Sequence, residues 1–172
     1  VYGSINTNGA VTGRATHSTP NLAQVPAVII EYGPESRSLF CARDGYVLVG
    51  ADMSQIELRI LGHYMSAYDN GDYANDVVHG DIHTRTLEAL GLKKEERWKA
   101  KRFMYTWLYG GGAKKIGEVM GTTTEEGYKL KDKFLKKIPA LKQLVTKVQE
   151  VAATGELGAL DGRRIFCRSQ HS

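Results

Sequence analysis

The stretch Val47-Leu-Val-Gly-Ala-Asp-Met-Ser-Gln-Ile-Glu-Leu-Arg59 decides how the rest of the chain is organised. Its short apolar run, Val47 to Ala51, predicts a strand buried on both faces. A helix is expected to follow at once, because Ser54-Gln-Ile-Glu57 matches a capping box. Asp52 would then lie at the carboxyl end of a strand, where a carboxylate can reach solvent and a hard cation. The alternative is that Asp52 is only a turn residue at the surface.

The composition excludes several classes of protein. The 172 residues are 42% hydrophobic and 24% charged, which is typical of a globular domain and not of a disordered chain. The two cysteines, Cys41 and Cys167, form no disulfide pattern and suit a reducing cytosol. No apolar run approaches the roughly 18 residues needed to span a membrane, and no signal peptide begins the chain.

Charge is distributed unevenly along the chain. Residues 1–90 carry 5 Lys and Arg against 10 Asp and Glu, whereas residues 91–172 carry 18 against 9. An acidic half and a basic half suit a protein in which carboxylates hold metal ions and cations hold phosphates. Solvated helix faces would give the same asymmetry.

The first 45 residues are rich in Gly, Thr, Ser, Asn and Pro, which predicts short strands and turns. Within them, Arg14 follows a glycine that lets the backbone approach another molecule closely. A purely structural loop is the alternative for this segment.

Two helical stretches are expected next, from Ser54 to about Ala67 and from about Tyr73 to Leu90. The first has an apolar face formed by Ile56, Ile60, Leu61, Tyr64 and Met65. The second contains His79-Gly-Asp-Ile-His-Thr84, in which two histidines four residues apart resemble a metal pair. No third ligand or catalytic glutamate accompanies them, so a zinc site is disfavoured.

A helix from Lys93 to Tyr109 carries the clearest chemical pattern. Arg97, Lys101 and Tyr105 recur every four residues, each offset by about 40° from the last, so they share one stripe with Tyr109 a turn beyond. Two cations followed by an aromatic ring suit a triphosphate that carries a sugar and a base. A basic helix with an aromatic core contact is the alternative.

The remaining residues predict two helices, then a turn and a strand. Gly110-Gly-Gly112 with Lys114-Lys115 lacks the ending of a phosphate loop and is better explained as a turn between helices. Thr123-Thr-Glu-Glu126 is a second capping box, before a lysine-rich helix that Pro139 interrupts. Leu160 to Arg168 predicts a turn at Asp161-Gly162 followed by a strand.

Several segments together resemble the motifs of family A DNA polymerases, the DNA polymerase I family. Asp52 to Arg59 resembles motif A, and Arg97 to Gly110 resembles motif B, the O helix of the fingers. The Thr12-Gly-Arg14 segment, with Pro20 to Pro26, and the Gly80 to Thr84 segment match two further family signatures. The match runs from Gly9 to Arg168 in the family's order, and its details resemble the replicative polymerases of short-tailed lytic bacteriophages.

The resemblance implies an α+β fold, a partial right-hand polymerase with mostly helical fingers and short palm strands. It assigns residues 1–68 to the palm with motif A, residues 69–155 to the fingers, and residues 156–172 to a strand that returns to the palm. The family's second metal-binding aspartate lies in a His-Asp-Glu motif beyond the Gly-Arg-Arg strand, so the chain is expected to be a fragment of a longer protein.

The resemblance also implies a role for individual residues. Asp52 and the carbonyl of Met53 would bind two Mg²⁺ ions, and Lys101 would also act as the acid for the leaving pyrophosphate. The implied nucleotide-binding residues are Gln55, Glu57, His83, Arg97, Lys101 and Tyr105, with Glu57 blocking the 2′ position of the sugar. The implied DNA-binding residues are Arg14, Asn21, Gln24 and Tyr109.

The expected activity is template-directed DNA synthesis from dNTPs on primer-template DNA, in the cytoplasm, with no membrane contact and with a possible processivity factor bound by other regions. One alternative is a cellular repair polymerase of the same family. Another is a non-catalytic nucleic-acid-binding module. Asp52 and Glu57 disfavour the latter, because a simple DNA-binding module needs no carboxylates beside a phosphate site.

Overall fold

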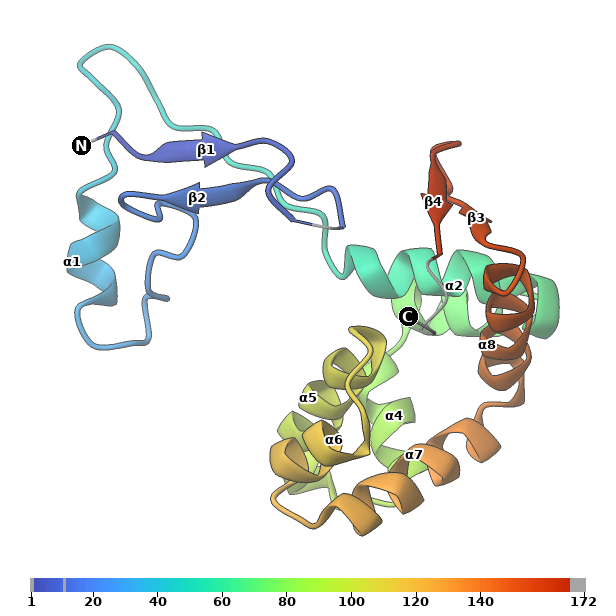
Figure 1. Cartoon of the computed structure of the whole chain (residues 1–172). Helices are drawn as coiled ribbons and strands as arrows, with labels where there is room; N and C mark the ends of the chain where they lie inside the picture. Colours follow the sequence, from blue (N-terminus) through green and yellow to red (C-terminus); the bar gives the residue numbers. More distant parts are fainter. Residues whose placement is uncertain (1, 11, 168–172) are drawn as a thin grey trace. The chain divides into compact units, whose positions relative to one another are not determined.

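The structure, a computed structural model, describes residues 2–10 and 12–167. The chain divides into two units between Asp52 and Met53, and each unit is described by itself. Figure 1 shows the elements in sequence colours.

The first unit contains little regular structure. Strands β1 (Ser4–Asn6) and β2 (Thr16–Ser18) pair antiparallel, with Ile5 opposite His17. Helix α1 (Gly33–Ser38) follows, and Arg37 donates from Nε to the carbonyl of Pro26 at 2.8 Å. The prediction of short strands and turns is confirmed.

The second unit is mainly helical, with one hairpin. Its elements in chain order are α2 (Ile56–Asp69), α3 (Asp72–His79), α4 (Ile82–Leu90), η1 (Lys94–Glu96), α5 (Arg97–Leu108), α6 (Ala113–Met120), α7 (Thr124–Lys137), α8 (Pro139–Ala152), β3 (Glu156–Gly158) and β4 (Arg164–Phe166). The hairpin pairs β3 with β4 antiparallel. Strand β4 and the turn before it match the turn and strand that were predicted from Leu160 onward.

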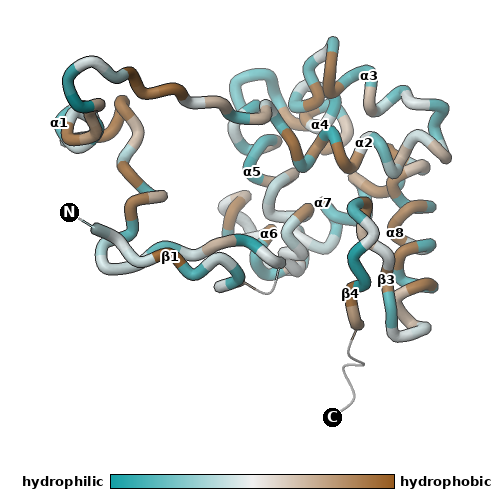
Figure 2. The backbone as a smooth tube through the Cα atoms, turned by 90° about the horizontal axis from the view of Figure 1, so that it is seen from above, coloured by the Kyte–Doolittle hydropathy of each residue, from teal (hydrophilic) through white to brown (hydrophobic). Residues whose placement is uncertain are grey.

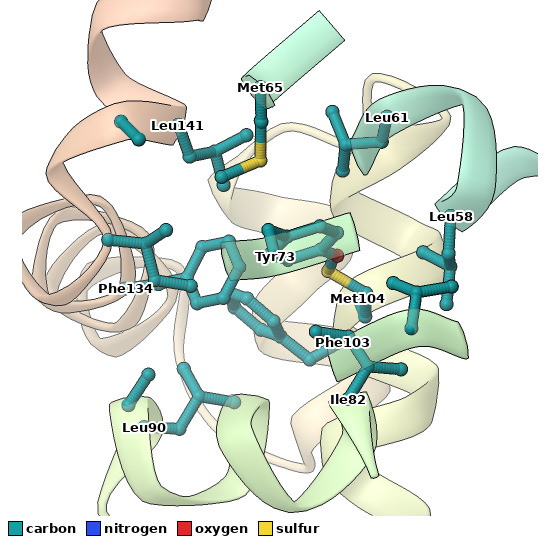
Figure 3. Close-up of a cluster of buried hydrophobic side chains, with 14 of the residues drawn as sticks. Leu58, Leu61, Met65, Tyr73, Ile82, Leu90, Phe103, Met104, Phe134 and Leu141 are labelled. Carbon is teal, nitrogen blue, oxygen red and sulfur yellow. The ribbon is translucent and has the colours of Figure 1, made fainter. Parts of the chain in front are cut away.

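One hydrophobic core holds the helices of the second unit together. Figure 3 shows side chains from α2, α4, α5, α7 and α8 meeting there. The Phe134 ring packs edge-on against Phe103, at 5.1 Å between centroids, and against Trp107, at 5.6 Å. Figure 2 shows hydrophobic residues recurring along α8 between hydrophilic ones, which is typical of a helix buried on one side.

Helices α6 and α7 approach each other closely through glycines. A Cβ atom at Gly127 would lie 2.2 Å from the carbonyl oxygen of Ala113, and one at Gly117 would lie 2.5 Å from that of Thr123. Real Cβ atoms do not approach backbone that closely, so glycine at these positions sets the spacing of the two helices.

The predicted buried strand at Val47 to Ala51 is wrong. The segment has no strand structure, and Val47 and Val49 are 83% and 90% exposed. A buried strand needs neighbouring strands on both edges and cover on both faces. Among the described residues, no strand pairs with this segment.

The predicted capping box at Ser54 to Glu57 is also wrong. Helix α2 begins at Ile56, its N-cap residue Gln55 is left-handed at φ 54°, and no side chain caps it. The carbonyl of Ser54 instead accepts from Arg59 Nε at 2.8 Å. The expected apolar face of α2 is only partly buried, because Leu61 and Met65 face the core whereas Ile56, Ile60 and Tyr64 are exposed.

The single helix expected from Tyr73 to Leu90 is two helices. It divides at Gly80, and Asp81 caps the second of them, α4, by accepting from the backbone N–H groups of His83 and Thr84. Asp81 also forms a two-pronged ion pair with Arg97 at the start of α5. Gly80 and the Asp81 cap therefore break the segment into two helices, although its apolar residues recur with a helical period.

Two C-terminal predictions, the break at Pro139 and the turn at Gly110 to Gly112, are confirmed, whereas only the threonine half of the second capping box is observed. Thr123 caps α7 by accepting from the N–H of Glu126 at 3.2 Å, and Pro139 ends α7 and occupies the first turn of α8. Gly110 to Gly112 lies between α5 and α6, as expected of a turn between helices.

Gly127→Ala tests the close approach of α6 and α7. Alanine favours a helix over glycine by about 1 kcal/mol, so without a clash the variant would be more stable. The clash with the Ala113 carbonyl oxygen outweighs this gain, and we expect the free energy of unfolding to fall by about 1–2 kcal/mol. Gly158→Ala, where a Cβ meets nothing within 4 Å, is the control and should change stability little. Chemical denaturation of both variants would measure this, and a stabilised Gly127→Ala would contradict it.

The Asp81–Arg97 pair predicts an acid-sensitive link between α4 and α5. The Arg97 guanidinium holds the pKa of Asp81 well below its ordinary value of 3.8. A depressed carboxyl pKa stabilises the fold above the unfolded-state pKa, and this contribution disappears as the pH falls below about 3.8. Asp81→Asn keeps a good N-cap residue but removes the charge. Its stability deficit relative to wild type should shrink as the pH falls from 6 to 2, measured by urea unfolding at each pH. A deficit that does not depend on pH would show that the pair contributes no electrostatic stability.

Candidate nucleotide-binding site

The predicted stripe on α5 is present along one side of the helix. Arg97 and Lys101 are exposed, Tyr105 is half-buried, and Tyr109 is 62% exposed just after the helix ends. The Tyr105 and Tyr109 rings stack, with centroids 6.2 Å apart and planes 28° from parallel. The helix therefore presents two cations at its beginning and an aromatic pair at its end.

His83 lies beside this stripe in the first turn of α4. Its ring is 6.4 Å from that of Tyr105, and the side chain is 8% exposed. Burial lowers the His83 pKa below 6.5, and the positive charge of Arg97 lowers it further. The imidazole is therefore neutral at pH 7, with one donor and one acceptor nitrogen. Its Nδ1 atom is buried and has no hydrogen-bond partner among the described residues.

Asp81 connects the beginnings of α4 and α5. Arg97 donates from Nε to Oδ2 at 3.0 Å and from Nη2 to Oδ1 at 2.7 Å. The same carboxylate accepts from the Thr84 hydroxyl at 2.8 Å. The sequence pattern had not predicted Asp81 as a helix cap or as a partner of Arg97. A helix-breaking Gly80 directly before an aspartate, with Thr84 three residues on, was the signal for a cap.

Glu57 faces the aromatic end of the stripe. Its Oε1 atom accepts from the Tyr109 hydroxyl at 2.9 Å, which joins α2 to the end of α5. Burial raises the pKa of Tyr105, and the negative charge of Glu57 raises it further. Since the capping box is not formed, the position of Glu57 is explained by this contact with the end of α5.

Gln55 and Met53 lie just before α2. The Oε1 atom of Gln55 is buried and has no hydrogen-bond partner in the part of the chain that the structure describes. Met53 is 65% exposed and lies before the first residue of α2, Ile56.

The remaining predicted site residues belong to the first unit. Asp52 and Arg14 are exposed. Asn21 and Gln24 are also exposed, and the Asn21 amide donates to Gln24 Oε1 at 3.1 Å. The structure thus brings together Glu57, His83, Arg97, Lys101, Tyr105 and Tyr109, and the assignments of Asp52, Arg14, Asn21 and Gln24 stay predictions.

A cavity of about 780 Å³ lies on a different side of α5. It is lined mainly by apolar side chains of α2, α8 and the β3–β4 hairpin, with Trp107 and Leu108 from α5. None of the stripe residues lines it, and its apolar walls suit side-chain packing rather than phosphates.

Within residues 2–10 and 12–167, no three His, Cys, Asp or Glu side chains gather as a metal site would require. None of the described helices is both long and apolar enough to cross a bilayer.

The family model for DNA polymerase family A matches residues 1–172. The DNA-directed DNA polymerases of Enterobacteria phage T3 and Escherichia phage T7 are each 42% identical over 195 aligned positions, covering 100% of this chain and 27% of each relative. DNA polymerase I of Helicobacter pylori is 31% identical over 164 positions, covering 92% of this chain and 18% of the relative. The chain therefore spans about a quarter of the phage relatives' length.

A solved structure shares the fold. The POL domain of Pol1 from M. smegmatis, in complex with DNA primer-template and dNTP, aligns with a TM-score of 0.71 and 23% identity over 100% of this chain and 31% of that one. This confirms the expected α+β class and partial polymerase fold. Together with the family match, these similarities show that the chain belongs to DNA polymerase family A.

Proposed function

We propose that this chain is the nucleotide-binding part of a DNA polymerase that performs template-directed DNA synthesis. The observation that carries the proposal is the stripe on α5, where two exposed cations precede a stacked tyrosine pair. Its length and chemistry suit a dNTP laid along the helix, with phosphates at the beginning and the base at the end.

Arg97 and Lys101 would bind the triphosphate, with His83 beside them. Arginine presents a planar fork that matches phosphate oxygens, and lysine adds a compact charge. The neutral His83 ring carries one N–H donor and can donate a hydrogen bond without adding charge. Lys101 is also the candidate acid that gives a proton to the leaving pyrophosphate.

Tyr105, Tyr109 and Glu57 would recognise the nucleoside. Tyr105 would pack on the sugar and base, and Tyr109 would stack near the template position. The hydrogen bond from Tyr109 to Glu57 supports a shared role, because it holds a carboxylate at the sugar end of the stripe. A carboxylate there would exclude a 2′-hydroxyl. Gln55, whose buried side-chain oxygen has no partner among the described residues, is proposed to contribute to the same recognition of the nucleoside.

The residues present could supply some of the ligands of a magnesium site. The Asp52 carboxylate is exposed and the Met53 carbonyl follows it, and both are the hard oxygen donors that Mg²⁺ prefers. Two Mg²⁺ ions would neutralise charge on the reacting phosphate and activate the primer hydroxyl. A second carboxylate is expected from the His-Asp-Glu motif of the family.

Primer-template DNA would contact Arg14, Asn21, Gln24 and Tyr109. In this proposal residues 1–68 belong to the palm, 69–155 to the fingers and 156–172 to the returning strand. We place the polymerase in the cytoplasm, with a processivity factor bound by other regions. The higher identity to the phage enzymes than to the bacterial one favours a replicative polymerase over a repair polymerase.

Asp52→Asn in the intact polymerase tests the metal assignment and the activity together. A neutral amide is a poor magnesium ligand, whereas DNA affinity rests mostly on Lys and Arg. We expect primer extension to fall more than tenfold, at least about 1.4 kcal/mol of barrier, with primer-template affinity nearly unchanged. Asp44→Asn, an exposed aspartate of the same unit, is the control. If Asp52→Asn kept more than about a tenth of the wild-type rate, Asp52 would not be a metal ligand.

Tyr105→Phe tests how the stripe recognises the sugar. A dideoxynucleotide lacks the 3′-hydroxyl that helps to organise its own triphosphate, and the Tyr105 hydroxyl can replace that group in a hydrogen bond worth about 0.5–1.5 kcal/mol. We expect the wild type to accept dideoxynucleotides readily and the variant to discriminate against them. Competition assays against normal nucleotides would measure both enzymes, with Tyr128→Phe on the exposed side of α7 as the control. Equal discrimination by wild type and Tyr105→Phe would mean that Tyr105 serves only as a stacking surface.

A further inference from the structure

The ion pair between Asp81 and Arg97 fixes the orientation of a side chain that the proposed function assigns to the triphosphate. Asp81 is itself held rigidly, because its carboxylate oxygens accept from the backbone N–H of His83 at 3.1 Å and from the Thr84 hydroxyl at 2.8 Å. These bonds anchor the carboxylate to the first turn of α4. The Arg97 fork then binds an acceptor that cannot move independently of the helix.

The geometry leaves part of the Arg97 fork for another acceptor. A guanidinium has five N–H donors in one plane. Asp81 accepts from Nε and from Nη2, so Nη1 takes no part in the ion pair. The Arg97 side chain is also 49% exposed. A phosphate can therefore approach Nη1 while Asp81 remains bound to Nε and Nη2.

We propose that Asp81 is a positioning residue for nucleotide binding, an inference that rests on the proposed function. Asp81 holds Arg97 in the orientation that binds the triphosphate. An arginine that is free to rotate loses side-chain entropy when a ligand orders it. With Asp81 in place, that ordering happens on folding instead of on nucleotide binding, which improves affinity. Asp81 acts in this way through Arg97 and touches no substrate.

The position of His83 is tied to the same anchor. The backbone N–H of His83 donates to Asp81, and the His83 ring lies in the helical turn that Asp81 caps. One carboxylate thus sets the places of a cation on α5 and of a neutral imidazole on α4. A direct electrostatic role predicts the opposite effect, because a carboxylate near a polyanion repels it.

The test is steady-state nucleotide incorporation by the intact polymerase on primer-template DNA, with dATP opposite a single template thymine. Asp81→Asn preserves the helix cap but loses the charged fork acceptor. We expect the KM for dATP to rise about tenfold, with a smaller change in kcat. Asp76→Asn is the matched control, because Asp76 forms a partly exposed ion pair with Arg85, which is not a residue of the stripe. It should leave the KM within about twofold of wild type.

A double-mutant cycle with Arg97→Ala identifies the route of the effect. If Asp81 acts through Arg97, then Asp81→Asn should raise the KM in the wild-type background and change it little in the Arg97→Ala background. A lower KM in Asp81→Asn would mean charge repulsion, and an equal rise in both backgrounds would mean a general disturbance of α4. Either result would overturn the proposal.

The same cycle separates this inference from the proposed function. If Arg97→Ala raises the KM and Asp81→Asn does not, Arg97 remains a triphosphate ligand and only the positioning role is wrong. If Arg97→Ala leaves the KM unchanged, the assignment of Arg97 to the triphosphate is itself wrong, and the positioning role is rejected with it.

Discussion

The burial of Phe103 on α5 is the constraint on which the candidate site depends. Phe103 is fully buried against Phe134 of α7, and the neighbouring Met104 is fully buried as well. With 3.6 residues per turn, fixing these two side chains in the core fixes the rotation of α5. Arg97, Lys101 and Tyr105 then lie along the edge of the buried side, where charged ends reach solvent and the tyrosine is half-covered. Core packing thus determines which way the stripe residues on α5 face.

Polar contacts then fix the two ends of the stripe. Asp81 holds the cationic end through Arg97, and Glu57 holds the aromatic end through Tyr109. Both carboxylates lie on other helices, α4 and α2, and so these contacts connect the site to the surrounding fold. Exposed ion pairs add little stability, and their value here is better understood as orientation of side chains that would otherwise rotate freely.

Helix periods and breakers in the sequence were enough to predict α5, α7, α8, the Gly110 to Gly112 turn, and strand β4 with the turn before it, because these depend on local residues. Helix α6 and strand β3 were not predicted. The strand at Val47 to Ala51 could not be judged in this way, since a buried strand depends on neighbours that no local pattern reveals. The capping box failed because α2 begins one residue later than expected, with the left-handed Gln55 and not Ser54 at its N-cap, and because the Glu57 side chain accepts from Tyr109. The stripe was predicted, but its partners were not, because Asp81 and Arg97 are 16 residues apart.

The central claim is that a nucleoside triphosphate lies along α5. Photo-crosslinking the intact polymerase, bound to primer-template DNA, with 8-azido-dATP and mapping the labelled peptide by mass spectrometry tests it most directly. The account predicts labelling within the stripe, near Tyr105 and Tyr109, that unlabelled dATP suppresses and that Arg97→Ala weakens. Labelling confined to peptides outside residues 53–167, with α5 unmodified, would contradict it.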